Sequence, residues 1–128
     1  MTDKRYPRSL RLLTPADFKR VMDGALFKAS QSHFLLLAVP SATPHSRLGF
    51  IVAKKKVRLA VDRNRIKRCL RENFRLLQSQ LPPMDIVFLA RQDVGRLDND
   101  SLHQGARDGF RRLARKAAQA GLEATATE

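Results

Sequence analysis

The chain has 128 residues, 43% of them hydrophobic, which is the size and composition of one domain with its own apolar core. Its charges are unbalanced, because 25 Lys and Arg residues face 12 Asp and Glu residues and give a formal net charge of +13. Surplus positive charges repel one another in a folded chain, so they indicate a polyanionic partner. Nucleic acid is the leading candidate and an anionic membrane surface is the second.

The number of cysteines and the hydropathy pattern indicate the cellular compartment in which we expect the protein. Cys69 is the single cysteine, so an internal disulfide of the kind that staples secreted domains is excluded. The N-terminal segment is basic but no apolar stretch follows it, and we expect no signal peptide. The longest apolar run, from Phe34 to Val39, is too short to span a bilayer. We therefore expect a cytoplasmic protein without a membrane partner.

The first elements in chain order are an arm and a short helix. Residues 1–13 are basic, contain Pro7 and show no hydrophobic period, which predicts a mobile basic arm. Thr14 then fits the N-cap of a helix whose first position is Pro15. Gly24 is placed to end this helix.

Three strands are predicted next. Residues 26–29 have the length of a short strand, and the continuous apolar run at 33–39 is a buried-strand pattern. The Pro, Ser and Thr residues of 40–46 predict a turn. Apolar residues alternate in 47–53, which predicts a third strand with one buried face.

The strongest helix signal follows. Apolar side chains recur at helical spacing from Ile66 to Leu77, and Asp62 is placed to cap this helix. Residues 85–90 then show a buried-strand pattern. Because a helix separates this strand from the one at 47–53, the two strands have room for a parallel crossover.

The last predicted element is a helix at 98–120, which Gly121 ends. We expect residues 122–128 to form a frayed tail. The predicted order is therefore αβββαβα, an α/β (α+β) fold, and residues 1–128 are expected to form a single RNA-binding domain.

Positive charge is concentrated in residues 54–75, which hold ten basic residues against two acidic ones, a net +8 of the chain's +13. Like charges at helical spacing repel each other, whereas a helix face of one sign suits phosphate groups. A merely solvated face is the competing interpretation. On a helical wheel the side away from Ile66 carries Asn64, Lys67, Arg68, Arg71 and Arg75, with Arg63 and Arg65 at its flanks.

The same stretch carries a family resemblance. Leu48-Gly49-Phe50-Ile51-Val52-Ala53-Lys54-Lys55, followed by Ala60-Val61-Asp62-Arg63-Asn64-Arg65-Ile66-Lys67-Arg68, resembles the protein subunit of bacterial ribonuclease P. An Arg-Asn-Arg-x-x-Lys-Arg run after a glycine-containing strand and a Lys-Lys pair is that family's signature. The resemblance extends to residues 17–21, 34–39 and 85–91. It implies a two-layer sandwich with a left-handed β-α-β crossover, against the usual right-handed rule.

The resemblance implies a function divided between RNA and protein. A large catalytic RNA subunit, which binds most of the Mg²⁺ of the holoenzyme, hydrolyses the bond between the 5′ leader and mature tRNA. The protein supplies no catalytic group, binds the RNA subunit through the Arg-Asn-Arg helix, and holds the leader of precursor tRNA between its first helix and the sheet. No obligate protein partner is implied. The implied RNA-subunit contacts are Arg63, Asn64, Arg65, Lys67, Arg68 and Arg71. The implied leader-cleft residues are Phe18, Met22, Leu37, Lys54 and Lys55.

Two of these positions depart from the family pattern. The family often has aromatic residues at the positions of Met22 and Leu37, where this chain has aliphatic ones. Stacking on an aromatic ring contributes about 1–3 kcal/mol per base, so we expect weaker binding of the leader or a different preference. Core packing is the competing interpretation for Phe18 and Leu37.

Other residues that could carry chemistry have simpler interpretations. Cys69 fits a small buried hydrophobe, and the three histidines lack the spacing of zinc ligands. Asp98 and Asp100 could bind a divalent ion, but they also open a helix, where acids cap backbone amides. Two other classes remain open: a basic ribosomal or general RNA-binding protein, and a DNA-binding module that uses the basic helix.

Overall fold

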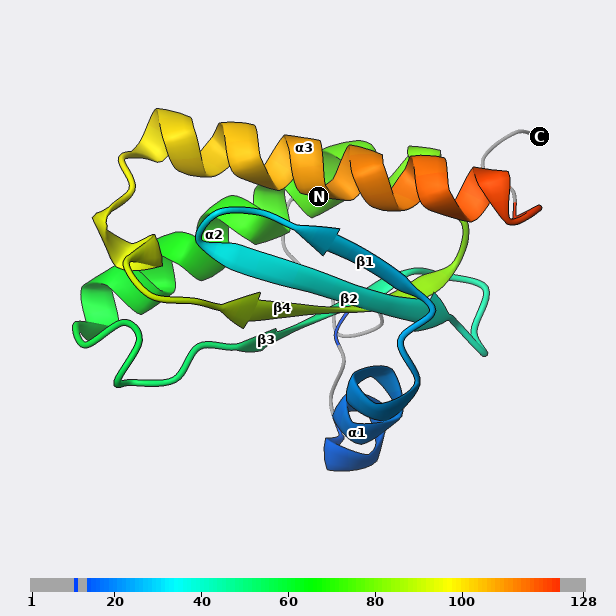
Figure 1. The fold of residues 1–128 in the computed structure, drawn as a ribbon, viewed down its shortest axis with the longest axis horizontal. Coiled ribbons are helices and arrows are strands. Elements are labelled where there is room, and N and C mark those ends of the chain that lie inside the picture. The colour runs from blue at the N-terminus through cyan, green and yellow to red at the C-terminus, as the bar shows by residue number, and fades with distance from the viewer. Residues whose placement is uncertain (1–10, 12–13, 123–128) are drawn as a thin grey trace, which may run out of the picture.

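The computed structural model describes residue 11 and residues 14–122 (Figure 1), and its main elements confirm the predicted order αβββαβα. They are α1 (Pro15–Gly24), β1 (Phe27–Ser30), β2 (Phe34–Pro40), β3 (Arg47–Ile51), α2 (Ala60–Leu77), β4 (Met84–Ala90) and α3 (Asn99–Gln119), with the short 3-10 turns η2 (Gln78–Gln80) and η3 (Val94–Arg96). The predicted basic arm lies outside the described residues apart from Arg11, which forms an isolated parallel bridge with Leu48 of β3.

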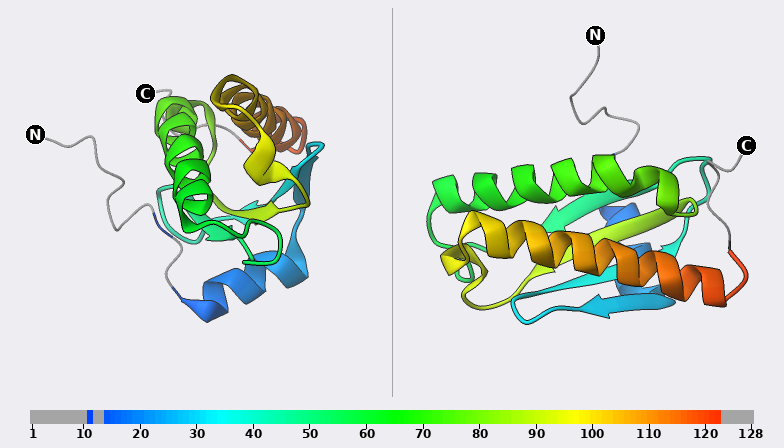
Figure 2. Two further views of the ribbon diagram at one scale, coloured as in Figure 1. Left: turned by 90° about the vertical axis from the view of Figure 1, so that its left-hand side faces the viewer. Right: turned by 90° about the horizontal axis from the view of Figure 1, so that it is seen from above.

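The four strands form one mixed sheet in the order β1-β2-β4-β3. β2 pairs antiparallel with β1 and with β4, whereas β3 and β4 are parallel and are joined through α2. In the right-hand view of Figure 2, α2 lies toward the viewer, β3 and β4 both point to the left, and β3 lies above β4. When this view is turned so that the strands point up, the chain passes from β3 on the right through α2 to β4 on the left. The crossover is therefore left-handed, as the family resemblance implied, although most β-α-β units have the opposite hand.

Two helices cover one face of the sheet. α2 and α3 lie side by side on that face and form the expected two-layer sandwich with it, while α1 packs against the opposite face (Figures 1 and 2). The main core between the layers contains four fully buried aromatic rings. Phe34 and Phe88 of the sheet have ring centroids 4.9 Å apart, and Phe74 of α2 lies 5.9 Å from Phe110 of α3.

A second, smaller apolar cluster lies between α1 and the sheet. Val21 of α1 is buried there with Leu37, Val39 and Val87, and Phe18 packs against them while partly buried. β2 and β4 are thus covered on both faces, which explains why their sequences are continuous apolar runs without alternation.

Most helix ends agree with the predictions. Thr14 caps α1, because its Oγ1 accepts from the backbone amide of Asp17 at 3.1 Å. Asp98 caps α3 in the same way, accepting from the amide of Ser101 at 2.7 Å. Gly121 ends α3 with a φ of 92°, a left-handed conformation that glycine adopts without strain. No helix of the described residues is both long and apolar enough to cross a membrane.

Two predictions about helix ends are wrong. The N-cap of α2 is Leu59, which makes no side-chain capping bond, so Asp62 lies inside the first turn and does not cap the helix. Leu122 is not frayed, because its amide donates to the carbonyl of Ala117 at 2.9 Å and its side chain packs against the core. The rest of the predicted tail, residues 123–128, lies outside the described part of the chain.

The edge strand β1 is held by α3 as well as by β2. Arg112 Nη1 donates to the carbonyl oxygen of Ser30 at 3.0 Å, and Lys116 Nζ donates to the carbonyl oxygen of Lys28. Two backbone acceptors along this strand are therefore occupied by positively charged side chains of α3.

Candidate RNA interface

The exposed face of α2 presents positive charge to solvent. Asn64, Arg68 and Arg75 are exposed and Lys67 is half-buried, and the side chains of these four residues form no hydrogen bond or ion pair with another described residue. Arg71 is half-buried, and its guanidinium carbon lies 5.5 Å from the centre of the Phe50 ring, a cation–π distance. We call Asn64, Lys67, Arg68, Arg71 and Arg75 the basic face. The charges of Lys67, Arg68 and Arg75 are therefore available to phosphate groups.

The two arginines beside Asn64 are bound within the protein instead. Arg63 Nη1 donates to the carbonyl oxygens of Val57 and Arg58, both at 2.9 Å. Arg65 reaches η3 and the start of α3: it donates to the Gly95 carbonyl at 2.9 Å and to Asn99 Oδ1 at 3.0 Å. The Arg65 guanidinium also lies 3.8 Å from the Asp62 carboxylate. Both side chains therefore have structural contacts that a helical wheel does not reveal.

The structure brings three of the predicted leader-cleft residues to the α1 side of the sheet. Phe18 and Leu37 meet in the smaller apolar cluster, where Leu37 is only 7% exposed and Phe18 is half-buried. Met22, on the solvent side of α1, is 38% exposed. Leu37 thus has the surroundings of a core residue. Met22 is the exposed apolar side chain at this place, and Phe18 is partly exposed, as are Leu35 and Ile51 of the sheet.

The two predicted lysines lie elsewhere. Lys54 and Lys55 are exposed in the turn that follows β3, far from α1 along the sheet (Figure 1). Lys55 lines a pocket at the start of α2 together with residues of η3. The structure therefore does not join these lysines to Phe18 and Met22 in one compact site. A nucleic-acid strand could contact both places only by running along the sheet.

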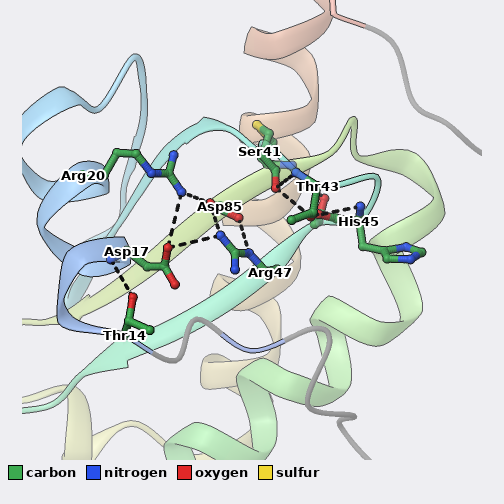
Figure 3. A network of polar contacts seen from close by, with 10 residues as sticks. Thr14, Asp17, Arg20, Ser41, Thr43, His45, Arg47 and Asp85 are labelled. Atoms are coloured by element: carbon green, nitrogen blue, oxygen red, sulfur yellow. Dashed lines mark hydrogen bonds and ion pairs between the residues drawn. The ribbon is translucent and has the colours of Figure 1, made fainter.

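An acidic residue of β4 ties α1 to the sheet. Asp85 is fully buried, and its Oδ1 and Oδ2 accept from Nε and Nη2 of Arg47 at 2.8 and 2.7 Å. Arg20 of α1 donates to the same Oδ2 from the other side (Figure 3). The Asp17 carboxylate lies 3.4 Å from Arg47 and 3.9 Å from Arg20, which completes a network of two acids and two arginines.

The protonation of this network follows from its contacts. Burial alone would raise the pKa of Asp85, but hydrogen bonds from Arg47 and Arg20 outweigh it, and the pKa lies below its ordinary value. The hydrogen bond to Asp85 in turn raises the pKa of Arg47. The network therefore fixes the position of α1, and with it Phe18 and Met22. An acidic residue in a buried strand is the one sequence signal for it, since its partners lie 38 and 65 residues away.

The remaining candidates behave as structural groups. Burial raises the pKa of the Cys69 thiol to about 11, with a further contribution from Glu72, so the thiolate is scarce at neutral pH. Asp98 is engaged as a helix cap, and its pKa is lowered by the hydrogen bond from the amide of Ser101. Within residues 14–122, no three His, Cys, Asp or Glu side chains are grouped to hold a metal ion.

Comparison with known proteins agrees with this fold and charge pattern. The ribonuclease P family model matches residues 6–116. The ribonuclease P protein component of Chromohalobacter salexigens is 44% identical over 98% of this chain and 98% of its own length. That of Acinetobacter baylyi is 50% identical over 91% of this chain and 89% of its own length.

Solved structures give the same result. The RNase P protein of Staphylococcus aureus superimposes with a TM-score of 0.73 and 29% identity, covering 80% of this chain and 93% of its own. The RNase P protein of Thermotoga maritima gives a TM-score of 0.66 and 27% identity, covering 83% and 96%. The family match spans α1, the whole sheet and most of α3, so it is not confined to the Arg-Asn-Arg helix. The chain belongs to the ribonuclease P protein family.

Proposed function

We propose that this protein is the accessory protein subunit of ribonuclease P. In this proposal it binds the catalytic RNA subunit and the 5′ leader of precursor tRNA, and the holoenzyme removes the leader by endonucleolytic hydrolysis. The observation that carries the proposal is the basic face of α2, in a chain that belongs to this family. Neighbouring cations of one sign cost stability unless a polyanion neutralises them, so the arrangement favours an RNA partner.

The RNA subunit is proposed to bind at the start and along the exposed side of α2. Asn64, Lys67 and Arg68 offer donors without a partner among the described residues, and Arg71 offers a guanidinium oriented by the Phe50 ring. Arg63 and Arg65 are included in the proposed contact, each with part of its guanidinium already donating to backbone carbonyls. Because Arg presents a planar fork of donors, it can bind the protein and a phosphate oxygen at once.

The leader is proposed to bind on the α1 side of the sheet. Phe18 and Met22 offer accessible apolar surface there, and Phe18 packs on the buried cluster that contains Leu37. The Asp85 network keeps α1 against the sheet, which preorganises this surface and so reduces the conformational entropy that is lost on binding. Lys54 and Lys55 would meet a backbone that extends beyond this surface along the sheet.

The catalytic step is proposed to belong to the RNA subunit and its Mg²⁺. In this division of labour the protein contributes affinity for precursor tRNA and screens repulsion between RNA phosphates. The supporting observation is the surplus of cations, since each Lys or Arg that meets a phosphate releases condensed counterions from the RNA.

Cleavage of precursor tRNA at low Mg²⁺ tests the proposal. The reaction is run with bacterial ribonuclease P RNA, with and without this protein, and with the protein alone. We expect strong stimulation of the RNA and no cleavage by the protein alone. A folded protein that binds RNA but gives no stimulation would instead favour a ribosomal or general RNA-binding role.

A further inference from the structure

A pocket of about 450 Å³ lies where the turn after β3 meets the start of α2 and η3. One wall is the turn and the first residues of the helix, and the other is the segment that leads into η3. Four cations and two carboxylates line the pocket, which leaves a net charge of +2. The cations are Lys55, Lys56, Arg58 and Arg96, and the carboxylates are Asp62 and Asp93.

The two arginines beside Asn64 hold the walls of this pocket. Arg63 donates to two carbonyl oxygens of the turn, those of Val57 and Arg58, both at 2.9 Å. Arg65 donates to the Gly95 carbonyl of the opposite wall at 2.9 Å. These bonds are charge-assisted, so each arginine anchors one wall to α2 and sets the distance between the walls.

Close packing between the walls adds to this constraint. A Cβ atom built on Gly95 would lie 3.2 Å from Cγ1 of Val57 and 3.7 Å from Cβ of Asp62, so the absence of a side chain permits the approach. Leu59, which lines the pocket, is the N-cap of α2 and provides no side-chain acceptor for the first amides of the helix. The positive end of the helix dipole therefore reinforces the cations of the pocket.

We propose that this pocket binds a phosphate group of the RNA backbone, and that Arg63 and Arg65 are positioning residues for it. Arg58 presents a fork of donors and the two lysines present point charges, a combination suited to a phosphodiester. RNA is the favoured source of this phosphate. Arg63 and Arg65, which hold the pocket walls, directly flank Asn64 of the basic face, so one RNA strand can reach both the pocket and the basic face. This assignment of the source rests on the proposed function, whereas the pocket's affinity for phosphate does not.

The first arm of the test uses the full-length protein and inorganic phosphate. ¹⁵N-labelled protein is titrated with phosphate against chloride at equal ionic strength. We expect saturable shifts of the amide signals of Val57 and Arg96 in the wild type and their loss in the double variant Lys56→Gln/Arg96→Gln. A matched control, Arg111→Gln/Arg115→Gln, removes the same charge from the exposed face of α3 and should keep the saturable response.

The second arm measures affinity for ribonuclease P RNA at several salt concentrations. The slope of log K against log [salt] should fall by about 1 for each RNA phosphate that Lys56→Gln/Arg96→Gln no longer neutralises. The control variant should keep the wild-type slope. Phosphate saturation with an unchanged slope would overturn RNA as the source, and absence of both responses would overturn the pocket itself.

Arg65→Lys tests the positioning role. The substitution retains the charge, but one ammonium group cannot span the Gly95 carbonyl and Asn99 as the guanidinium does. We expect faster amide exchange at residues 94–97 and the same fall in slope as in the double variant, with an unchanged far-UV circular dichroism spectrum. A wild-type slope in Arg65→Lys would overturn the positioning role. If the wild-type protein fails to bind the RNA at all, the proposed function fails, while the phosphate arm still tests the pocket.

Discussion

Replacement of Asp85 by Asn tests whether the buried network fixes α1 on the sheet. The substitution keeps the shape of the side chain but removes its charge and turns one acceptor oxygen into a donor facing an arginine. Arg47, only 17% exposed, would lose two charge-assisted hydrogen bonds and retain Asp17 at 3.4 Å. Removing one partner of a buried ion pair costs about 3–5 kcal/mol, and because Asp17 remains we expect about 3 kcal/mol.

Thermal unfolding followed by circular dichroism measures this loss. For a chain of this size, about 3 kcal/mol corresponds to a fall in Tm of about 10 °C. Asp23→Asn is the matched control, because it removes a carboxylate of α1 whose ion pair with Lys19 is largely solvent-exposed, and it should leave Tm unchanged. A Tm of Asp85→Asn within about 2 °C of the wild type would refute the reasoning that this network holds α1.

The remaining predictions concern pH, packing, reactivity and RNA contact. The pKa of Asp85 in the folded protein lies below its unfolded value of about 3.9, so its contribution to stability is complete above that pH and disappears as the pH falls through the folded pKa. The Tm should therefore fall less between about pH 5 and pH 2 in Asp85→Asn than in the wild type. Gly109→Ala places a Cβ 2.8 Å from Cδ1 of the fully buried Leu36. The energetic cost of this overpacking should exceed the stabilisation from the higher helix propensity of Ala, so the free energy of unfolding in urea should fall by about 1 kcal/mol. Cys69 should react with a thiol reagent at about pH 8 at least about tenfold more slowly in the folded than in the urea-unfolded protein, and equal rates would contradict its burial. Phe18→Ala should weaken binding of precursor tRNA but not of mature tRNA in the assembled holoenzyme, whereas an equal loss on both would argue against a leader surface beside α1.

Patterns within short segments predict most of the fold. The αβββαβα order, the caps at Thr14 and Asp98 and the end of α3 at Gly121 follow from local chemistry, and the structure agrees with each. The predicted cap at Asp62 is wrong, since an acidic residue in the first turn has the same local signature as a capping residue. The handedness of the crossover comes from the family resemblance alone, because no local pattern encodes it.

The candidate site is less predictable, because it depends on contacts between distant segments. The helical wheel places Arg65 beside the basic face, but only the folded chain brings Gly95 and Asn99 within its reach. The periodicity of β2 likewise cannot tell which face of the sheet α1 will cover, and Leu37 lies under that helix with little exposed surface. RNA contacts of the individual residues remain predictions.

The bonds from Arg112 and Lys116 to β1 have a consequence for the free protein. An uncovered edge strand is a template on which a second chain can add by backbone pairing, and this is a common route to aggregation. Here a second copy of the chain would have to displace two charged side chains from the carbonyl oxygens of Ser30 and Lys28. It would also carry a net positive charge toward a positively charged surface. The surplus of positive charge thus protects the sheet edge before assembly, in addition to attracting RNA.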